Sequence, residues 1–136
     1  MTINKKLVYL PLLSICLLLL IISCSNGKVS NNSYEKISAE AAKTIIDSDE
    51  KHYLVDVRSE AEYLQEHLPS AILIPVEELE EKAKTLLPNQ KVVIMVYCRS
   101  GRRSAYAADI LVRLGYSWVY DIGGIIDWPY DTIKGE

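Results

Sequence analysis

Short apolar runs alternate with stretches of helical spacing along the chain after residue 33. Residues 53–57, 71–74, 92–97 and 118–122 form largely apolar runs whose lengths are typical of buried strands. Before and between these runs, apolar or small residues recur every three or four positions, which predicts three helices. Their buried faces would contain Ala42, Ile45 and Ile46 in the first, Val76, Leu79, Ala83, Leu86 and Leu87 in the second, and Ser104, Ala108 and Leu111 in the third. Strands that alternate with helices predict an α/β fold with a central, mostly parallel sheet flanked by helices.

Polar residues mark the expected helix ends. Ser38 is suited to cap the first helix, residues 59–66 predict a short helix, and Gly115 is suited to end the last one. The helix at 76–87 starts among acidic side chains, which are Glu77, Glu78, Glu80 and Glu81. Because negative charge stabilises a helix amino terminus, this cluster indicates a solvated helix start and not a metal site.

The first residues have the form of a secretory signal. Lys5 and Lys6 precede an apolar stretch of sixteen residues, Leu7 to Ile22. This stretch contains Pro11 and is shorter than the roughly twenty residues that a spanning helix needs. We therefore expect a segment that directs export.

The segment Ile21-Ile22-Ser23-Cys24 resembles a bacterial lipobox, in which cleavage precedes the cysteine and the new terminal cysteine is acylated. We expect a lipoprotein-type signal peptide at 1–23, lipid on Cys24, a flexible tether at 24–33 and a folded domain at 34–136. An uncleaved amino-terminal membrane anchor is the alternative. Either arrangement makes the domain exported and membrane-anchored, at the periplasmic face of a membrane or the outer face of a plasma membrane.

Charge and cysteine count narrow the expected partners. The formal net charge is −3, and loss of residues 1–23 would remove two lysines and no acid, leaving −5. Such an acidic protein argues against nucleic acid as a partner. Cys16 would leave with the signal and Cys24 would carry lipid, so Cys98 would be the only free thiol and no intrachain disulfide could form.

Cys98 is the candidate reactive residue. It ends the apolar run 92–97 and opens the string Cys98-Arg99-Ser100-Gly101-Arg102-Arg103-Ser104, which leads into the last helix. Ligands of parallel sheets bind at the carboxyl ends of strands, where this cysteine is expected. Free amides of the first helical turn and three arginines favour a thiolate, and Gly101 lets the loop curl into an anion-binding nest. The alternative is a small cysteine that only fills the core.

The neighbours of Cys98 exclude several chemistries. A phosphatase loop needs arginine six positions after the cysteine, where this chain has Ser104. No histidine lies within thirty residues of Cys98, and no second cysteine is near enough for a Cys-x-x-Cys redox pair. An ionised thiol in a short cationic loop instead suits attack on an anionic sulfur donor, which requires no general base.

Four segments together resemble a single-domain rhodanese, a family of sulfurtransferases, over nearly all of the chain after residue 33. They are Tyr53-Leu54-Val55-Asp56-Val57-Arg58; Glu62-Tyr63 with His67-Leu68-Pro69-Ser70-Ala71-Ile72-Leu73-Ile74-Pro75; Cys98 to Arg103; and Gly123-Gly124-Ile125-Ile126-Asp127-Trp128. The resemblance implies a three-layer rhodanese-like fold. Two positions depart from the family pattern, because Glu66 and Ser70 stand where the family usually has glycine.

The resemblance also implies a mechanism. The Cys98 thiolate would attack the outer sulfur of thiosulfate or a similar anionic donor, sulfite would leave, and a persulfide would remain on Cys98. A cellular thiol, such as a protein thiol, would then take the sulfur, and cyanide would serve in the laboratory. No cofactor or metal is implied.

Roles for the other residues follow from the same resemblance. The rest of the loop would hold the donor and the persulfide; its residues are Arg99, Ser100, Gly101, Arg102, Arg103 and Ser104. Arg99 and Arg103 are the first choices for donor binding, and Arg102 is expected to be a charge at the rim. Ser104 would donate to the thiolate or cap the helix. Structural roles near the site are expected for Asp56, Arg58, His67, Gly123 and Gly124. A direct part in catalysis is the alternative for Asp56 and Arg58, as is a base role for His67.

Two other functions stay open. A non-catalytic persulfide carrier or partner-binding module would keep the fold without turnover. Arsenate or phosphate ester chemistry would need a longer loop with arginine at the position of Ser104.

Overall fold

A five-stranded parallel sheet runs through the centre of residues 33–135, the part of the chain that the computed structural model describes. The strands are β1 (Glu35–Lys36), β2 (His52–Asp56), β3 (Ile72–Leu73), β4 (Val93–Cys98) and β5 (Trp118–Gly124). Their order across the sheet is β1-β5-β4-β2-β3, and each neighbouring pair is parallel. The expected α/β class is therefore confirmed.

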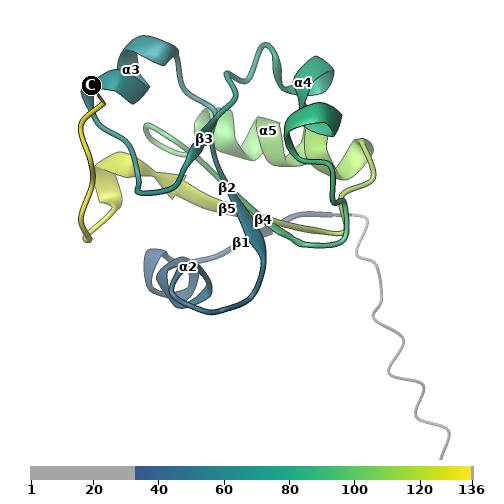
Figure 1. Cartoon of the computed structure of the whole chain (residues 1–136), viewed down its shortest axis with the longest axis horizontal. Helices are drawn as coiled ribbons and strands as arrows, with labels where there is room; N and C mark the ends of the chain where they lie inside the picture. Colours follow the sequence, from purple (N-terminus) through teal and green to yellow (C-terminus); the bar gives the residue numbers. More distant parts are fainter. Residues whose placement is uncertain (1–32, 136) are drawn as a thin grey trace, which may run out of the picture.

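Helices cover both faces of this sheet (Figure 1). They are α2 (Ala39–Ile46), α3 (Glu60–Gln65), α4 (Leu79–Leu86) and α5 (Arg102–Arg113), with a short 3₁₀ helix η1 (Ile125–Asp127) after β5. Helix α2 lies on one side of the sheet, and α4 and α5 lie together on the other. Two apolar clusters fill the two interfaces, which gives the three layers that the family resemblance implies.

Strand β4 lies in the middle of the sheet because both of its faces are apolar. Ile94, Val96 and Cys98 belong to the cluster under α4 and α5, whereas Met95 and Tyr97 belong to the cluster on the α2 side. This alternation follows from the two-residue period of a strand. It delivers Cys98 at the carboxyl end of β4, on the side of the sheet that α5 covers.

Local capping explains where two helices begin. The Ser38 hydroxyl accepts the amide N–H of Ala41 at 3.2 Å, which confirms the predicted cap of α2. Before α3, Ser59 and Glu62 form a reciprocal capping box, in which each side chain accepts the other residue's amide.

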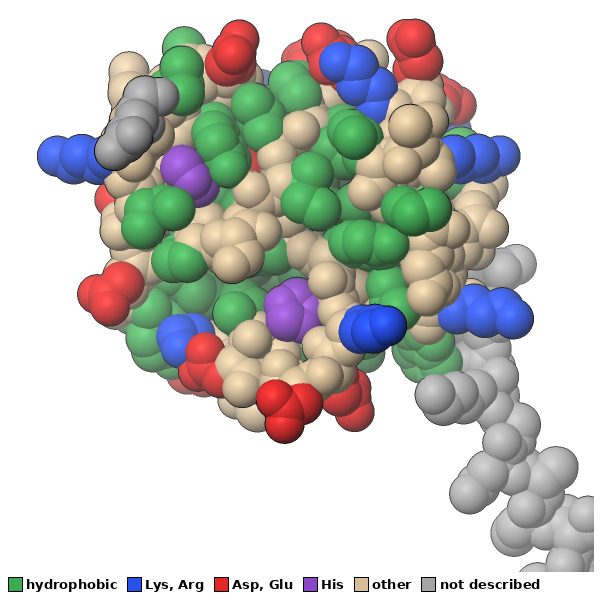
Figure 2. All heavy atoms as spheres, viewed as in Figure 1, with side chains coloured by type: hydrophobic (Ala, Val, Ile, Leu, Met, Phe, Trp, Pro, Cys, Tyr) green, Lys and Arg blue, Asp and Glu red, His purple; other side chains and the backbone are tan. Residues whose placement is uncertain are grey.

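On the face drawn in Figure 2, charged side chains lie mainly around the margin, and apolar and uncharged atoms fill the centre.

Several details differ from the expectations. Strand β5 continues through Gly124, two residues beyond the predicted run 118–122, because Gly124 still pairs with Cys98 of β4 after an irregularity in register. Leu86 was expected in the buried face of its helix but is 42% exposed, since Leu87 takes the buried position. An antiparallel bridge between His67 and Ile133 ties the carboxyl-terminal segment to the domain and was not predicted.

The predictions for the amino-terminal region lie outside the described residues. These are the signal peptide at 1–23, the lipid on Cys24 and the tether up to residue 32. Within residues 33–135, none of the helices has the length and apolar character needed to cross a membrane.

Candidate active site

Cys98 lies at the end of β4, directly beneath the first turn of α5. Its side chain is free of any disulfide and only 1% exposed. The amide N–H of Gly101 donates to the Cys98 sulfur at 3.1 Å, and the Ser104 hydroxyl oxygen lies 3.7 Å from the same sulfur. The strand, the loop and the helix therefore converge on one sulfur atom.

Two opposing effects act on the pKa of the Cys98 thiol. Burial is the largest of them and raises the pKa. The amide and hydroxyl of Ser104 and the amides of Gly101 and Ser100 hydrogen-bond to the sulfur and together outweigh burial, so the pKa lies below its ordinary value. The site therefore favours a thiolate, as expected for a nucleophilic cysteine at a helix amino terminus.

Ser104 is fully buried and its hydroxyl faces several acceptors. The hydroxyl lies 3.1 Å from the Gly101 carbonyl oxygen and 3.3 Å from the Gly123 carbonyl oxygen. With a neutral thiol, Cys98 donates to the Ser104 oxygen. When the thiol ionises, the hydroxyl can turn its single proton to the sulfur. The capping role considered for Ser104 is wrong, because Gly101 is the cap residue and no side chain caps α5.

Glycines allow the active loop to pack closely against the end of β5. Gly101 has φ of 97°, in the left-handed region, which lets the chain turn from the loop into α5. A Cβ at Gly124 would lie 2.6 Å from the Ser100 Cα and even closer to the Arg99 carbonyl oxygen. The Arg99 carbonyl also accepts the amide of Ile126 at 3.3 Å. The start of η1 therefore supports the loop from outside.

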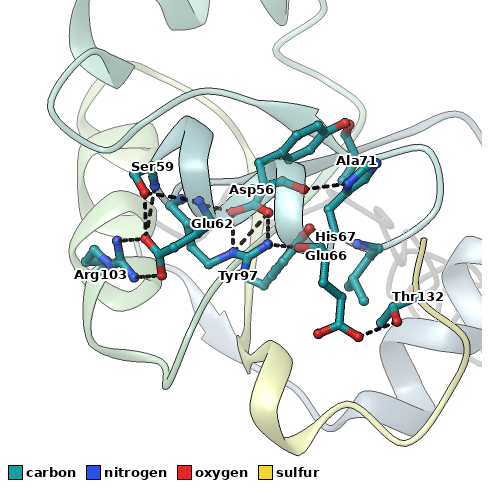
Figure 3. Close-up of polar contacts among 12 residues, drawn as sticks. Asp56, Ser59, Glu62, Glu66, His67, Ala71, Tyr97, Arg103 and Thr132 are labelled. Carbon is teal, nitrogen blue, oxygen red and sulfur yellow. Dashed lines mark hydrogen bonds and ion pairs between the residues drawn. The ribbon is translucent and has the colours of Figure 1, made fainter. Parts of the chain in front are cut away.

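The three arginines of the loop have different surroundings. Arg103 makes two hydrogen bonds of 2.8 Å to the two carboxylate oxygens of Glu62 on α3 (Figure 3). Arg99 lines a cavity of about 380 Å³ together with residues of α3 and η1. Arg102 is exposed. The structure thus gives Arg99 and Arg103 different surroundings, although the sequence treats them alike.

Asp56 and Arg58 form a buried ion pair at the end of β2. The guanidinium donates to the carboxylate at 2.7 Å, and it also donates to the backbone carbonyl of Glu66. It lies 5.6 Å from the centre of the Tyr97 ring. Burial acts most strongly on Arg58 and opposes its charge, yet the hydrogen bond and charge of Asp56 raise its pKa. These contacts join β2, β4 and the segment after α3 (Figure 3).

His67 is buried and held by local contacts. Its Nδ1 lies 2.8 Å from the Tyr63 carbonyl oxygen, and its ring stacks on the Tyr63 ring with centroids 3.7 Å apart. Its backbone pairs with Ile133. The contacts of His67 are thus with α3 and the carboxyl-terminal segment.

The two departures from the family pattern have different consequences. Ser70 has φ of 66° and is the one non-glycine residue with positive φ in residues 33–135. Glu66 has φ of −169°, an extended conformation that any residue adopts. Only Ser70 therefore occupies a position that favours glycine.

Sequence reasoning missed two residues of the site region. Glu62 was noted only as part of a motif, and its pairing with Arg103 across 41 positions has no local signal. Asp121 is buried and holds Gly123 through its carboxylate. The spacing of Ser59 and Glu62 does signal a helix start, but it does not reveal the partner in α5.

Comparisons with known proteins agree with this geometry. The model of the family described as "Rhodanese-like domain" matches residues 38–129. Over 81 residues the chain is 40% identical to "Thiosulfate sulfurtransferase PspE" of Escherichia coli, covering 60% of this chain and 78% of that protein. It is 39% identical over 102 residues to "Putative sulfur carrier protein YrkF" of Bacillus subtilis, covering 74% of this chain and about half, 54%, of that protein.

A solved structure supports the same assignment. The structure titled "rhodanese with anions from E. coli" superposes with a TM-score of 0.60 at 38% identity and covers 62% of this chain and all of that one. Fold, strand-loop-helix site and sequence similarity agree over the same segment of the chain. The chain therefore belongs to the rhodanese family.

Proposed function

We propose that this chain is a sulfurtransferase that carries sulfur as a persulfide on Cys98. One observation carries the proposal above the others. The buried Cys98 sulfur receives the Gly101 amide at 3.1 Å and lies beside the Ser104 hydroxyl, in surroundings that lower its pKa. A core cysteine without chemical function has no need of such hydrogen bonds.

The reaction has two displacement steps at sulfur. The Cys98 thiolate attacks the outer sulfur of thiosulfate, a sulfur–sulfur bond forms, and the bond to the sulfite sulfur breaks. Sulfite leaves with the electron pair of that bond. An acceptor thiolate, or cyanide in an assay, then attacks the outer persulfide sulfur, and Cys98 leaves as a thiolate. Charge is conserved in each step, and no external oxidant is needed.

The loop residues serve this chemistry by binding negative charge. The amides of Ser100 and Gly101 and the hydroxyl of Ser104 face the sulfur, where they stabilise the thiolate and the persulfide anion. Arg99 and the exposed Arg102 place positive charge at the loop, which attracts a doubly negative donor. No proton has to be moved by a general base.

The test is the mass of the protein before and after the donor is added. The full chain, purified in detergent, is incubated with thiosulfate, its intact mass is recorded, and cyanide is then added while thiocyanate is followed. We expect a gain of one sulfur atom that cyanide removes, and no gain in Cys98→Ser. A wild-type mass that stays unchanged with thiosulfate would contradict the proposal.

A carrier function is the second candidate, supported by the Bacillus subtilis relative whose name refers to a sulfur carrier. A carrier would accept sulfur from a protein persulfide but not from thiosulfate. Adding a persulfide-loaded donor protein in a parallel mass experiment separates the two functions. Gain of sulfur from the protein donor alone would favour the carrier.

We also propose that lipid on Cys24 anchors the domain to a membrane after export. The lysines, the apolar stretch and the segment Ile21-Ile22-Ser23-Cys24 support this proposal. We expect the wild-type chain in the membrane fraction of a bacterial host, labelled by a fatty-acid analogue. Cys24→Ser should lose the label, and a label that persists in this variant would contradict lipidation at Cys24.

A further inference from the structure

Glu62 and Arg103 connect helix α3 to the helix that begins at the active loop. The Arg103 guanidinium donates from Nη1 to Oε2 and from Nη2 to Oε1 of Glu62, each at 2.8 Å (Figure 3). Parallel double contacts of this kind restrict a guanidinium in position and in orientation. Both side chains are about 30% exposed, so the pair lies at the edge of the protein and not deep in it.

Arg103 lies in the first turn of α5, five positions after Cys98. The hydrogen bond that it donates to Glu62 is the largest influence on its pKa and raises it, burial opposes this, and the charge of Glu62 and then that of Cys98 raise it further. The Glu62 carboxylate therefore holds this guanidinium close enough to Cys98 for their charges to interact. Its position relative to the sulfur depends on what holds it from the other side.

Glu62 is itself well fixed. Its Oε2 accepts the amide and the hydroxyl of Ser59, at 3.1 and 3.0 Å. The hydrogen bond from Arg103 acts most strongly and, with those from Ser59, lowers the pKa of Glu62 to about 2 despite partial burial. The carboxylate is thus ionised at neutral pH and cancels the positive charge of Arg103 on the side of α3.

The remaining cation on that side of the loop is Arg99. It lines the cavity of about 380 Å³ whose wall also contains Glu62, Gln65, Glu66 and the apolar residues Ile125 and Ile126. Arg58 lines the same cavity, but Asp56 neutralises it. Among the described residues, no ion-pair partner is found for Arg99. Of the two carboxylates in the wall, that of Glu62 binds Arg103 and that of Glu66 accepts the hydroxyl of Thr132, so the Arg99 guanidinium is the one left to bind an anion.

From these contacts we infer that Glu62 is a positioning residue for sulfur transfer: it holds Arg103 in the first turn of α5, beside the active loop, and thereby leaves Arg99 as the cation that binds the anionic donor. The inference rests on the proposed function and divides the work of two arginines that the sequence does not distinguish. Glu62 makes no hydrogen bond to the reacting sulfur, and it acts through Arg103.

Two readouts on the full chain in detergent test this inference. The first is single-turnover sulfite release, which yields the limiting rate and the thiosulfate concentration at half that rate. The second is the pH midpoint of iodoacetamide alkylation, followed on the peptide that contains Cys98. Glu62→Gln is compared with Glu60→Gln, the same change at an exposed position of α3.

We expect Glu62→Gln to lower the limiting rate about tenfold, without a rise in the half-saturating concentration, and to move the alkylation midpoint upward. The control variant should stay within about twofold of wild type in both readouts. An unchanged or lowered midpoint in Glu62→Gln would overturn the inference, because Arg103 would then not depend on Glu62 for its place beside the loop. The same losses in Glu60→Gln would also overturn it, since they would show that loss of any negative charge from α3 is enough.

Arg99→Ala tests the other half of the inference, with Arg113→Ala in the last turn of α5 as its matched control. We expect a rise of about tenfold in the half-saturating thiosulfate concentration, and an unchanged alkylation midpoint. A half-saturating concentration equal to that of Arg113→Ala would show that Arg99 does not bind the donor. If wild type releases no sulfite at all, the proposed function fails, whereas the alkylation midpoints still decide the role of Glu62.

Discussion

Neutral hydrogen-bond donors, rather than an acid–base partner, surround the Cys98 sulfur. The donors are amides and one hydroxyl from the loop and the first turn of α5. The amides need no reorganisation when the thiol ionises, because the fold already points them at the sulfur, and only the Ser104 hydroxyl turns its proton. The contacts of His67 are with Tyr63 and Ile133, which fits a reaction that moves no proton.

Ser70 allows a direct test of backbone strain. Its φ of 66° costs an L residue more than glycine, so Ser70→Gly should raise the free energy of unfolding by about 1 kcal/mol, measured by urea denaturation. The matched change is Glu66→Gly, at the other position where the family usually has glycine. Because Glu66 is extended and bonds to Thr132, this variant should lose stability. A Ser70→Gly chain no more stable than wild type would contradict the argument.

Secondary-structure elements hold the active loop from two sides. The end of β5 and η1 pack on the backbone of Arg99 and Ser100, and α3 reaches the start of α5 through Glu62 and Arg103. The buried pair of Asp56 and Arg58 in turn fixes the segment after α3 to the end of β2. A short loop with few contacts of its own is thus kept in one conformation.

The two glycines at the end of β5 should respond differently to alanine. Gly124 has ordinary strand angles, but a Cβ there would collide with Arg99 and Ser100, so Gly124→Ala should displace the loop and slow persulfide formation more than about tenfold. At Gly123 nothing lies within 4 Å of an added Cβ, and φ is 84°. Gly123→Ala should therefore cost about 1 kcal/mol of stability and retain most activity. Equal activities in the two variants would contradict this reading of the loop.

The buried pair should matter far more for stability than a surface pair. Arg58→Met leaves the Asp56 carboxylate buried without its partner and should lower the free energy of unfolding by about 3–5 kcal/mol. Lys82→Met breaks the exposed pair with Glu78 and should cost less than about 1 kcal/mol. Urea denaturation of both variants measures the difference. Similar losses would show that the Asp56–Arg58 pair is not a structural centre.

The molecule as a whole combines two apolar layers with an acidic surface. The clusters on the two sides of the sheet hold the helices in place, and the formal net charge of the chain is −3. Ion pairs that join distant helices therefore act on the stability of the whole domain, and their loss in acid should be visible in global unfolding.

Acid should weaken the domain partly through Glu62. Its pKa is lowered from the ordinary 4.5 to about 2, chiefly by the hydrogen bond from Arg103, so its contribution is complete above pH 4.5 and is lost as the pH falls toward 2. We expect the free energy of unfolding at pH 6 to be about 2 kcal/mol larger for wild type than for Glu62→Gln, after allowance for the partial exposure of Glu62. Urea denaturation at pH 6, 4 and 3 should show this gap closing. A gap that does not vary with pH would contradict an ionic role.

Contiguous segments were predictable from the sequence because their physics is local. The apolar run 92–97 matches β4, Ser38 caps α2, and the string from Cys98 to Ser104 already contains the thiol and the helix start that acts on it. Four ordered motifs were enough to indicate the family. In these cases neighbouring residues supply both partners of the interaction.

Contacts between remote segments could be seen only in the folded chain. The pairing of Glu62 with Arg103 spans 41 positions, and the closeness of Gly124 to Arg99 depends on how β5 packs beside the loop. The left-handed angle of Ser70 also has no signal in its residue type. Apolar periodicity and the motif at Cys98 therefore determined the alternation of strands and helices and the candidate thiol, whereas the different partners of the loop arginines were decided by distances that arise only when sheet and helices pack together.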